Sequence, residues 1–361
     1  MGLPGRYCIA ADIGDSGVSC VQLEPGRSGP QIARAAFAEF PPPPAGAEAP
    51  GDEQRLATLR DTLRRGRFRG RRVAMLLPPD HVYTVPLSFP RSKTDSVETG
   101  ILRELQKHLP FIVEEGVVDY PSLDTSGALV RVLVAAMRRD VIGKYVAGLE
   151  AAGYSLEAVD VSIAALARLH LHLAPPGANP VLLCHAGAAR TWMAVVGAGS
   201  ILAENSLAWG VQGLIQKLRV NLNLADGHGS AHFLLREYGL SYEDRGAGGA
   251  ALTDERKDAS RVVYQIAAPV VDELIRAIHA VTAYVRSEAP HAAIEGAFLY
   301  GRASGIRGID RYIQTRIGLR TALTDPLSKI PPVDDAVLAG LPEGESPALA
   351  LGLGLRKFPW L

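Results

Sequence analysis

Two short segments of the chain combine a polar side chain at the end of an apolar run with a glycine-bounded turn. In residues 8–23 the apolar run ends at Asp12, breaks into the turn Gly14–Gly17 and is followed by a second alternating run. Residues 181–196 repeat that layout. A tight turn of this kind exposes backbone N–H groups that attract phosphate oxygens, and an acid at the strand end can hold a hydrated magnesium ion. The two segments therefore predict a pair of phosphate-binding hairpins.

The second hairpin differs from the first at the position of the acid. His185 stands where a second carboxylate is expected. A neutral imidazole cannot supply the negative charge that holds hydrated magnesium, so we expect the half of the site that manages metal and water to be altered. The alternative is a core or edge histidine that bonds to a backbone carbonyl, and we favour that role over a catalytic base.

Further segments follow the hairpins in an order typical of one family. These are Glu98–Asp119, which contains Pro110-Phe111 after a helix, then Val132–Asp160, Phe298–Ile309 and Ala350–Arg356. Paired hairpins are the phosphate loops of the actin-like ATPase superfamily, and with these segments the chain resembles the PilM family of type IV pilus assembly and the related cytoplasmic part of GspL. The resemblance covers most of the chain. It implies an α/β fold, actin-like (ribonuclease H-like), with two domains around a cleft and small inserted subdomains.

Segments in which apolar residues alternate, as in strands, are followed by segments in which they recur at helical spacing. This order is expected of an α/β protein. A Pro-Pro-Gly element at residues 175–177 is the best candidate for a domain boundary. We therefore expect a first actin-like domain over residues 1–175, with an inserted subdomain at about 81–160. The second would span residues 176–361, with an inserted subdomain at about 205–258.

The resemblance also implies a nucleotide site between the two hairpins and a glycine-rich turn near residue 301. Its ligand would be ATP or ADP with magnesium, and Asp12 would hold the metal through water. The residues that would bind nucleotide, if binding is retained, are Asp12, Gly14, Asp15, Ser16, Gly17, Gly187, Ala188, Gly301 and Arg302.

Departures from the family pattern gather at this site. The degenerate positions are Ser19 in place of a lysine, His185 in place of an aspartate, Gly213 in place of a threonine, and Arg302 in place of a second glycine. We expect such a site to hydrolyse nucleotide very weakly even if it still binds it. The Arg302 side chain could fill the pocket or stack on the base, and the sequence leaves both open.

By resemblance, the function is that of a cytoplasmic scaffold of the type IV pilus or type II secretion machinery. PilM-like proteins bind the short N-terminal tail of a PilN-like inner-membrane protein and connect it to the pilus motor ATPase complex. The docking groove would involve the inserted subdomain around Phe89–Phe111, and copies could self-associate. An extended tail suits such a groove because main-chain pairing gives affinity and side-chain pockets give selectivity.

Two functions of other classes compete with a scaffold. An active actin-fold ATPase or small-molecule kinase would need a catalytic aspartate and an intact acid in the second hairpin, and neither is found. A filament-forming protein like FtsA would carry a terminal amphipathic membrane helix, which the sequence does not show.

Composition favours a folded protein of a reducing compartment. The 361 residues are 47% hydrophobic, and 38 basic residues balance 38 acidic ones, so nucleic acid is not an expected partner. The three cysteines, Cys8, Cys20 and Cys184, lie in apolar runs without metal-ligand spacing, so we expect no disulfide.

No signal peptide and no membrane-spanning run is evident, which predicts a cytoplasmic protein. The resemblance to the PilM family implies a place at the inner face of the inner membrane. A run of arginines between Arg64 and Arg72 either is solvated at a helix end or contacts anionic lipid. We favour the first reading, with membrane contact only peripheral.

Overall fold

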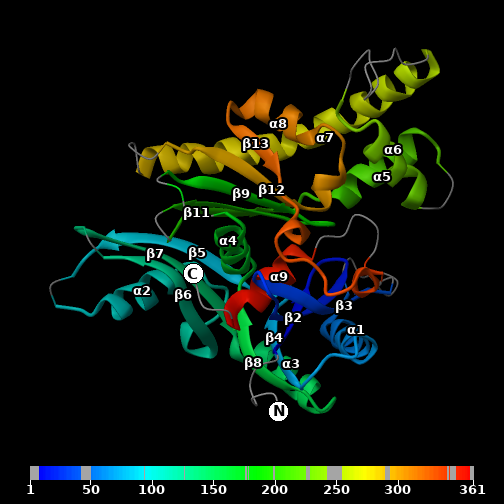
Figure 1. The fold of residues 1–361 in the computed structure, drawn as a ribbon. Coiled ribbons are helices and arrows are strands. Elements are labelled where there is room, and N and C mark those ends of the chain that lie inside the picture. Colours follow the sequence, from blue (N-terminus) through cyan, green and yellow to red (C-terminus); the bar gives the residue numbers. More distant parts are fainter. Residues whose placement is uncertain are drawn as a thin grey trace.

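The computed structural model describes the chain except residues 1–7, 42–49, 93, 126, 175–176, 178, 198–199, 225–227, 242–253, 289–292, 340, 342–346 and 358–361. Its strands form two five-stranded sheets and one three-stranded sheet. Each five-stranded sheet is the centre of one lobe, and Figure 1 shows the two sheets one above the other, with α4 between them. We call these the first and second lobes. The three-stranded sheet lies to one side and is called the inserted sheet.

The first lobe is built on a mixed sheet in which β1 and β2 form the first predicted hairpin. Helices α1 and α3 cover one face, and the C-terminal α9 covers the other. Every residue of β1 between Ile9 and Ala11 is buried, as in a central strand covered on both sides. In sheet order, the strands are β3 (Pro30–Glu39), β2 (Gly17–Pro25), β1 (Cys8–Ile13), β4 (Arg72–Leu76) and β8 (Ser155–Asp160). The helices are α1 (Asp52–Arg65), α3 (Arg139–Glu150) and α9 (Ala348–Gly354).

The second lobe repeats this plan, with the second predicted hairpin in its middle. In sheet order, its strands are β11 (Ser200–Leu207), β10 (Thr191–Gly197), β9 (Val181–Ala186), β12 (Gly296–Gly301) and β13 (Arg320–Leu323). Its helices are α5 (Val211–Asn221), α6 (His228–Glu237), α7 (Asp254–Glu288) and α8 (Ile309–Ile317). Helix α4 (Ser162–Leu173) packs on β9, β10 and α9, so it belongs to the boundary between the lobes.

A buried ion-pair network fixes α4 to the C-terminal segment. The Asp160 carboxylate accepts hydrogen bonds from Arg168 on α4 and from Arg356 after α9, each at 2.9 Å, while Arg168 also donates to the Gly352 carbonyl oxygen. The Asp160 and Arg168 side chains are only 7% and 11% exposed. Since a buried charge is tolerated when it is paired and hydrogen-bonded, this network holds the two lobes' shared helices in one arrangement.

Apolar residues at spacings of four or three between Val262 and Val285 predict a long helix over residues 258–289 with one apolar stripe. That helix is present as α7, but the predicted stripe is wrong at one end. Leu274, Ile278 and Val285 are buried as expected, whereas Val262 is 38% exposed and Val263 is buried in its place. A spacing of four residues advances faster than the helix period of 3.6, so the stripe rotates off the buried face over successive turns.

The inserted sheet consists of β5 (Tyr83–Pro90), β7 (Leu129–Arg138) and β6 (Gly116–Asp124), with α2 (Val97–Gln106) on one face. Its other face contributes Leu133, Ala135 and Met137 to the main core. The sheet also approaches β11, the edge strand of the second lobe (Figure 1). The boundaries of the inserted subdomains, at about 81–160 and 205–258, stay predictions.

Several arginines of the run between Arg64 and Arg72 form intramolecular contacts. Arg64 pairs with Asp61, Arg69 with Glu24 and Arg72 with Glu157. These contacts accord with a structural role at the surface. Within the described part of the chain, no helix is both long and apolar enough to cross a membrane, and the three cysteines are free thiols.

A buried carboxylate lies where β11 meets the inserted sheet. The Glu204 side chain bonds to Thr84 of β5, and burial raises the pKa of Glu204 to about 7 against the weaker opposing effect of that bond. Its Oε2 atom has no hydrogen-bond partner among the described residues. Burial at this place therefore favours the protonated carboxyl.

Replacing Glu204 with glutamine should change how stability depends on pH. Between pH 4.5 and about 7 the folded protein keeps a proton that the unfolded chain has lost, so this group's contribution to stability falls as pH rises and is constant above pH 7. Glutamine does not titrate, so the Glu204→Gln variant escapes this loss. We expect the difference in unfolding free energy between variant and parent to shift in favour of the variant by roughly 1–3 kcal/mol between pH 4.5 and about 7.

Urea unfolding at several pH values measures this difference. Glu288→Gln is the control, because the Glu288 side chain at the end of α7 is 41% exposed, and it should follow the parent at every pH. Parallel curves for the parent and Glu204→Gln would contradict the predicted linkage.

Candidate functional site

The two predicted hairpins face each other across a cleft between the lobes. Nearly all the residues singled out in the sequence line one cavity of about 70 Å³ there. Those that line it are Asp12, Gly14, Asp15, Ser16, Gly17, Ser19, His185, Gly187, Ala188, Gly301 and Arg302. Gly213 does not; it lies in the first turn of α5, and its N–H donates to the Gly210 carbonyl oxygen at 3.2 Å. The structure thus assembles one site from segments up to 290 residues apart.

The first hairpin turns tightly because its ends are bonded to one another. The Gly14 N–H donates to the Gly17 carbonyl oxygen at 3.0 Å, and the Phe40 N–H donates to the Ser16 carbonyl oxygen at 2.9 Å. A Cβ atom on Gly17 would lie 2.4 Å from the Ala38 carbonyl oxygen. Only glycine therefore fits where β2 leaves the turn beside β3.

The third loop reaches the cleft because β12 pairs in parallel with β9, which places Tyr300 opposite His185 and Gly301 opposite Ala186. Gly301 has φ +80°, and a Cβ atom there would lie 2.6 Å from the Ala186 carbonyl oxygen and 3.0 Å from the His185 Nε2 atom. This backbone conformation is open almost only to glycine. The chain can then turn directly from β12 into the loop that carries Arg302.

Burial disfavours the ionised form of Asp12 in this arrangement. It raises the pKa of Asp12 to about 7, with a smaller effect in the same direction from Asp15. The pKa of Asp15 is also raised by burial, against the opposing effect of the Arg190 guanidinium. Hydrated magnesium is attracted by an ionised carboxylate, and at neutral pH the Asp12 carboxyl spends much of its time protonated.

His185 at the end of β9 is a buried neutral imidazole. Burial lowers the pKa of His185 to about 4, and its side chain is 9% exposed. The Nδ1 atom has no hydrogen-bond partner among the described residues, so the proposed bond to a backbone carbonyl is not found for that atom. A neutral imidazole supplies no negative charge for a magnesium ion on this side of the cleft.

Arg302 brings a cation across the cleft from the second lobe to the first. Its Nη2 atom donates to the Ser16 Oγ atom at 3.2 Å, and burial lowers the pKa of this guanidinium against the opposing effect of Glu39. The sequence allowed the Arg302 side chain either to fill the pocket or to stack on a base. In the structure the side chain lies at the first hairpin. There it lies among the groups that would hold phosphate.

The cleft in this arrangement does not fit a magnesium nucleotide. The cavity of about 70 Å³ is well below the roughly 300–1,000 Å³ typical of sites for small organic ligands. The described residues contain no cluster of three acidic, histidine or cysteine side chains suited to a metal ion. Arg302 would have to leave Ser16 before a phosphate chain could enter.

Sequence reasoning missed Arg190, which lines the cleft after the second hairpin turn. The Arg190 carbonyl oxygen accepts from the Gly187 N–H at 2.9 Å, and its guanidinium lies 6.0 Å from the centre of the Trp192 ring. Its place directly after the Gly187 turn was the available signal, because a cation there can balance Asp15 on the opposite hairpin.

Comparison with known protein families tests the resemblance directly. The model of the family described as type IV pilus assembly protein PilM matches residues 10–358. The chain belongs to the PilM family. The matched residues include both lobes and the inserted sheet, so the match concerns the whole described fold.

Solved structures agree with this assignment. The PilM-PilN type IV pilus biogenesis complex is similar to this PilM-family chain over 98% of each chain, with 22% identity and a TM-score of 0.72. MreB 5 of Spiroplasma citri bound to AMPPNP matches 99% of this chain and 96% of its own, with 12% identity and a TM-score of 0.52. The ethanolamine utilization protein EutJ from Carboxydothermus hydrogenoformans matches 99% and 91%, with 14% identity and a TM-score of 0.51. The predicted two-domain actin-like fold is thus confirmed.

Substituting alanine for Gly301 should destabilise the protein. The new Cβ would meet the Ala186 carbonyl oxygen at 2.6 Å in a backbone region that alanine disfavours, so we expect a loss of roughly 1–3 kcal/mol of unfolding free energy. Gly305→Ala is the matched control, since a Cβ at Gly305 meets nothing within 4 Å. Equal thermal midpoints for the two variants would refute the strained-turn account.

Proposed function

We propose that this PilM-family chain is a cytoplasmic docking scaffold of type IV pilus assembly whose nucleotide cleft does not hydrolyse ATP. The observation that carries the proposal is the Arg302 guanidinium bonded to Ser16, in a cleft that is also lined by a carboxyl with a raised pKa and a neutral imidazole. A folded body with two lobes is retained, while the groups that handle metal and water are altered. Such a body serves binding rather than turnover.

The proposed partner is the N-terminal tail of a PilN-like inner-membrane protein. Support comes from the similar structure of a PilM-PilN complex and from apolar side chains around the inserted sheet. Phe89 and Phe111 are buried in its core, so they would shape a groove from beneath. The large apolar side chains exposed there are Ile112, Val117, Leu123 and Leu129.

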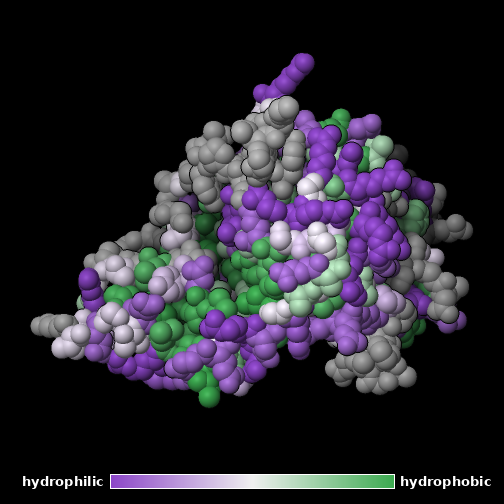
Figure 2. Space-filling view, turned by 90° about the horizontal axis from the view of Figure 1, so that it is seen from below, coloured by the Kyte–Doolittle hydropathy of each residue, from purple (hydrophilic) through white to green (hydrophobic). Residues whose placement is uncertain are grey.

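Figure 2 shows apolar surface gathered in the middle of one face of the molecule, with a hollow beside it. Strand β6, which carries Val117 and Leu123, is an edge of the inserted sheet. An extended tail can pair with such an edge while its side chains enter apolar pockets. By this proposal, the protein sits at the inner face of the inner membrane, touches lipid only peripherally, contacts the pilus motor ATPase complex and can self-associate.

Charge substitutions on the inserted sheet should weaken tail binding. We expect Ile112→Asp and Val117→Asp each to lower the affinity for a synthetic tail peptide of the PilN-like protein by about tenfold or more, because each buries a charge against the apolar tail. Ile112 and Val117 are 59% and 43% exposed, so folding should persist.

Isothermal titration calorimetry measures the affinity. Val220→Asp is the control on α5 of the second lobe, where the side chain is 68% exposed, and it should bind as the parent does. An unchanged affinity for both inserted-sheet variants would move the docking site elsewhere.

The competing function is an active ATPase or small-molecule kinase, which the retained hairpins favour. We expect no ATP hydrolysis by the parent chain, and His185→Asp alone should not restore it, because Ser19 and Arg302 remain at the same site. A phosphate-release assay with ATP and magnesium tests both chains. Brisk hydrolysis by the parent would establish an enzyme, and brisk hydrolysis by His185→Asp would show that the histidine alone had silenced it.

A further inference from the structure

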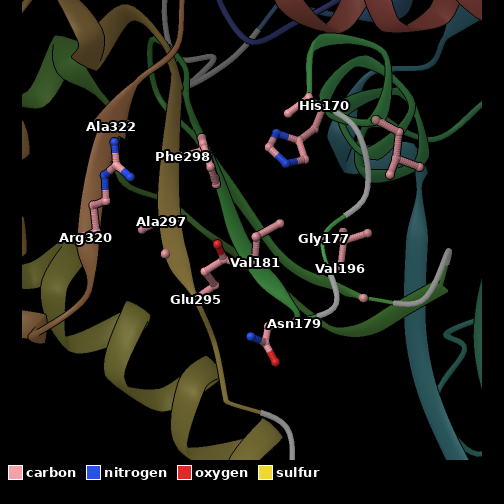
Figure 3. Close-up of a pocket in the computed structure, with 14 residues that line it drawn as sticks. His170, Gly177, Asn179, Val181, Val196, Glu295, Ala297, Phe298, Arg320 and Ala322 are labelled. Carbon is pink, nitrogen blue, oxygen red and sulfur yellow. The ribbon is translucent and has the colours of Figure 1, made fainter.

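A second, larger cavity of about 270 Å³ lies at the end of the second-lobe sheet away from the cleft. The hairpin turns follow the carboxyl ends of β9 and β12, whereas this cavity lies at their first residues, near Val181 and Gly296. The last turn of α4 covers it (Figure 3). Its volume is just below the range of about 300–1,000 Å³ for drug-sized ligands, so a smaller molecule would fill it.

The inner wall of the cavity is apolar and rigid. The ring centres of His170 and Phe298 lie 4.5 Å apart, and Val181 and Val196 line the same cavity. Figure 3 labels these four residues. The His170 Nδ1 atom shares a 2.8 Å hydrogen bond with the Tyr300 hydroxyl. Burial lowers the pKa of His170 to about 4, so the imidazole is neutral and acts as a flat wall.

Two opposite charges stand at the rim of this apolar space. Glu295 precedes β12, and Arg320 opens β13 directly opposite Gly296. Neither side chain forms an ion pair within the part of the chain that the structure describes. The Glu295 carboxylate lies over Gly177, where an added Cβ would approach its Oε2 atom to 3.2 Å, and Figure 3 shows the carboxylate turned into the cavity. The Asn179 amide lines the same rim.

We propose that this cavity binds a small zwitterion with an apolar body, of the class of apolar α-amino acids. The ligand's carboxylate would bind Arg320, its ammonium group would bind Glu295, and its side chain would pack against the wall formed by His170 and Phe298. An anion and a cation at the rim of an apolar space match such a molecule, because each charge of the ligand gains an opposite partner. Asn179 can serve either charged group, since an amide both donates and accepts.

Ligand-observed NMR with L-phenylalanine and L-leucine tests the proposal on the full chain. We expect saturable binding, with dissociation constants of about 0.1–1 mM for molecules this small. Phenethylamine lacks the carboxylate, 3-phenylpropionate lacks the ammonium group, and N-acetyl-phenylalanine amide lacks both charges. Each should bind about tenfold or more weakly than phenylalanine.

Two variants assign the charges. Arg320→Gln should remove the preference for phenylalanine over phenethylamine, and Glu295→Gln should remove the preference over 3-phenylpropionate, each without loss of the other preference. Arg311→Gln, on the exposed side of α8, is the control and should change neither. Equal binding of the capped amide, or the absence of saturable binding by either amino acid, would overturn the proposal. Tight binding of a protein segment in this cavity, blocked by Arg320→Gln and Glu295→Gln, would also overturn the proposal, because the ligand would then be a protein partner.

Discussion

The burial of two ionisable groups at facing strand ends is the constraint on which the account of this protein depends. Asp12 ends β1 and His185 ends β9, and both are pushed toward their neutral forms, with pKa values of about 7 and about 4. A carboxyl of raised pKa and a neutral imidazole attract a hydrated metal ion less strongly than two ionised carboxylates would. The cation that occupies the cleft is instead supplied by the protein itself, through Arg302.

This arrangement joins the lobes at the cleft between the two hairpins. Arg302 connects the second lobe to Ser16 in the first, while Asp160, at the same end of the first-lobe sheet as Asp12, binds Arg168 on α4. The lobes are thus held together at the cleft and at the shared helix. A body fixed in this way suits a docking function, since binding costs less when the surface is already ordered.

Much of the fold could be predicted because its signals are local. The paired hairpins, α4 and α7 each follow from a run of neighbouring residues, and Gly17 and Gly301 are glycines because a Cβ there would strike backbone oxygen atoms. The exposed Val262 shows where a count of four residues per turn fails over a long helix.

The interactions that define the site are of long range, and the sequence does not encode them in any short pattern. The bond from Arg302 to Ser16 joins residues 286 apart, and Glu204 meets Thr84 only because the inserted sheet folds back onto β11. Burial shifts the pKa values of Arg302 and Glu204, and this burial arises only when the distant segments pack together. Arg190 was missed because its role appears only when Asp15 of the other lobe lies close to it.

The most direct test of the central claim is a calorimetric titration of the parent and of Arg302→Ala with ATP and magnesium. The account predicts no measurable binding to the parent and a gain of affinity of about tenfold or more in the variant, because the guanidinium no longer fills the cleft. The opposite result, tight binding by the parent that weakens in Arg302→Ala, would show that Arg302 is a phosphate ligand and would contradict the claim.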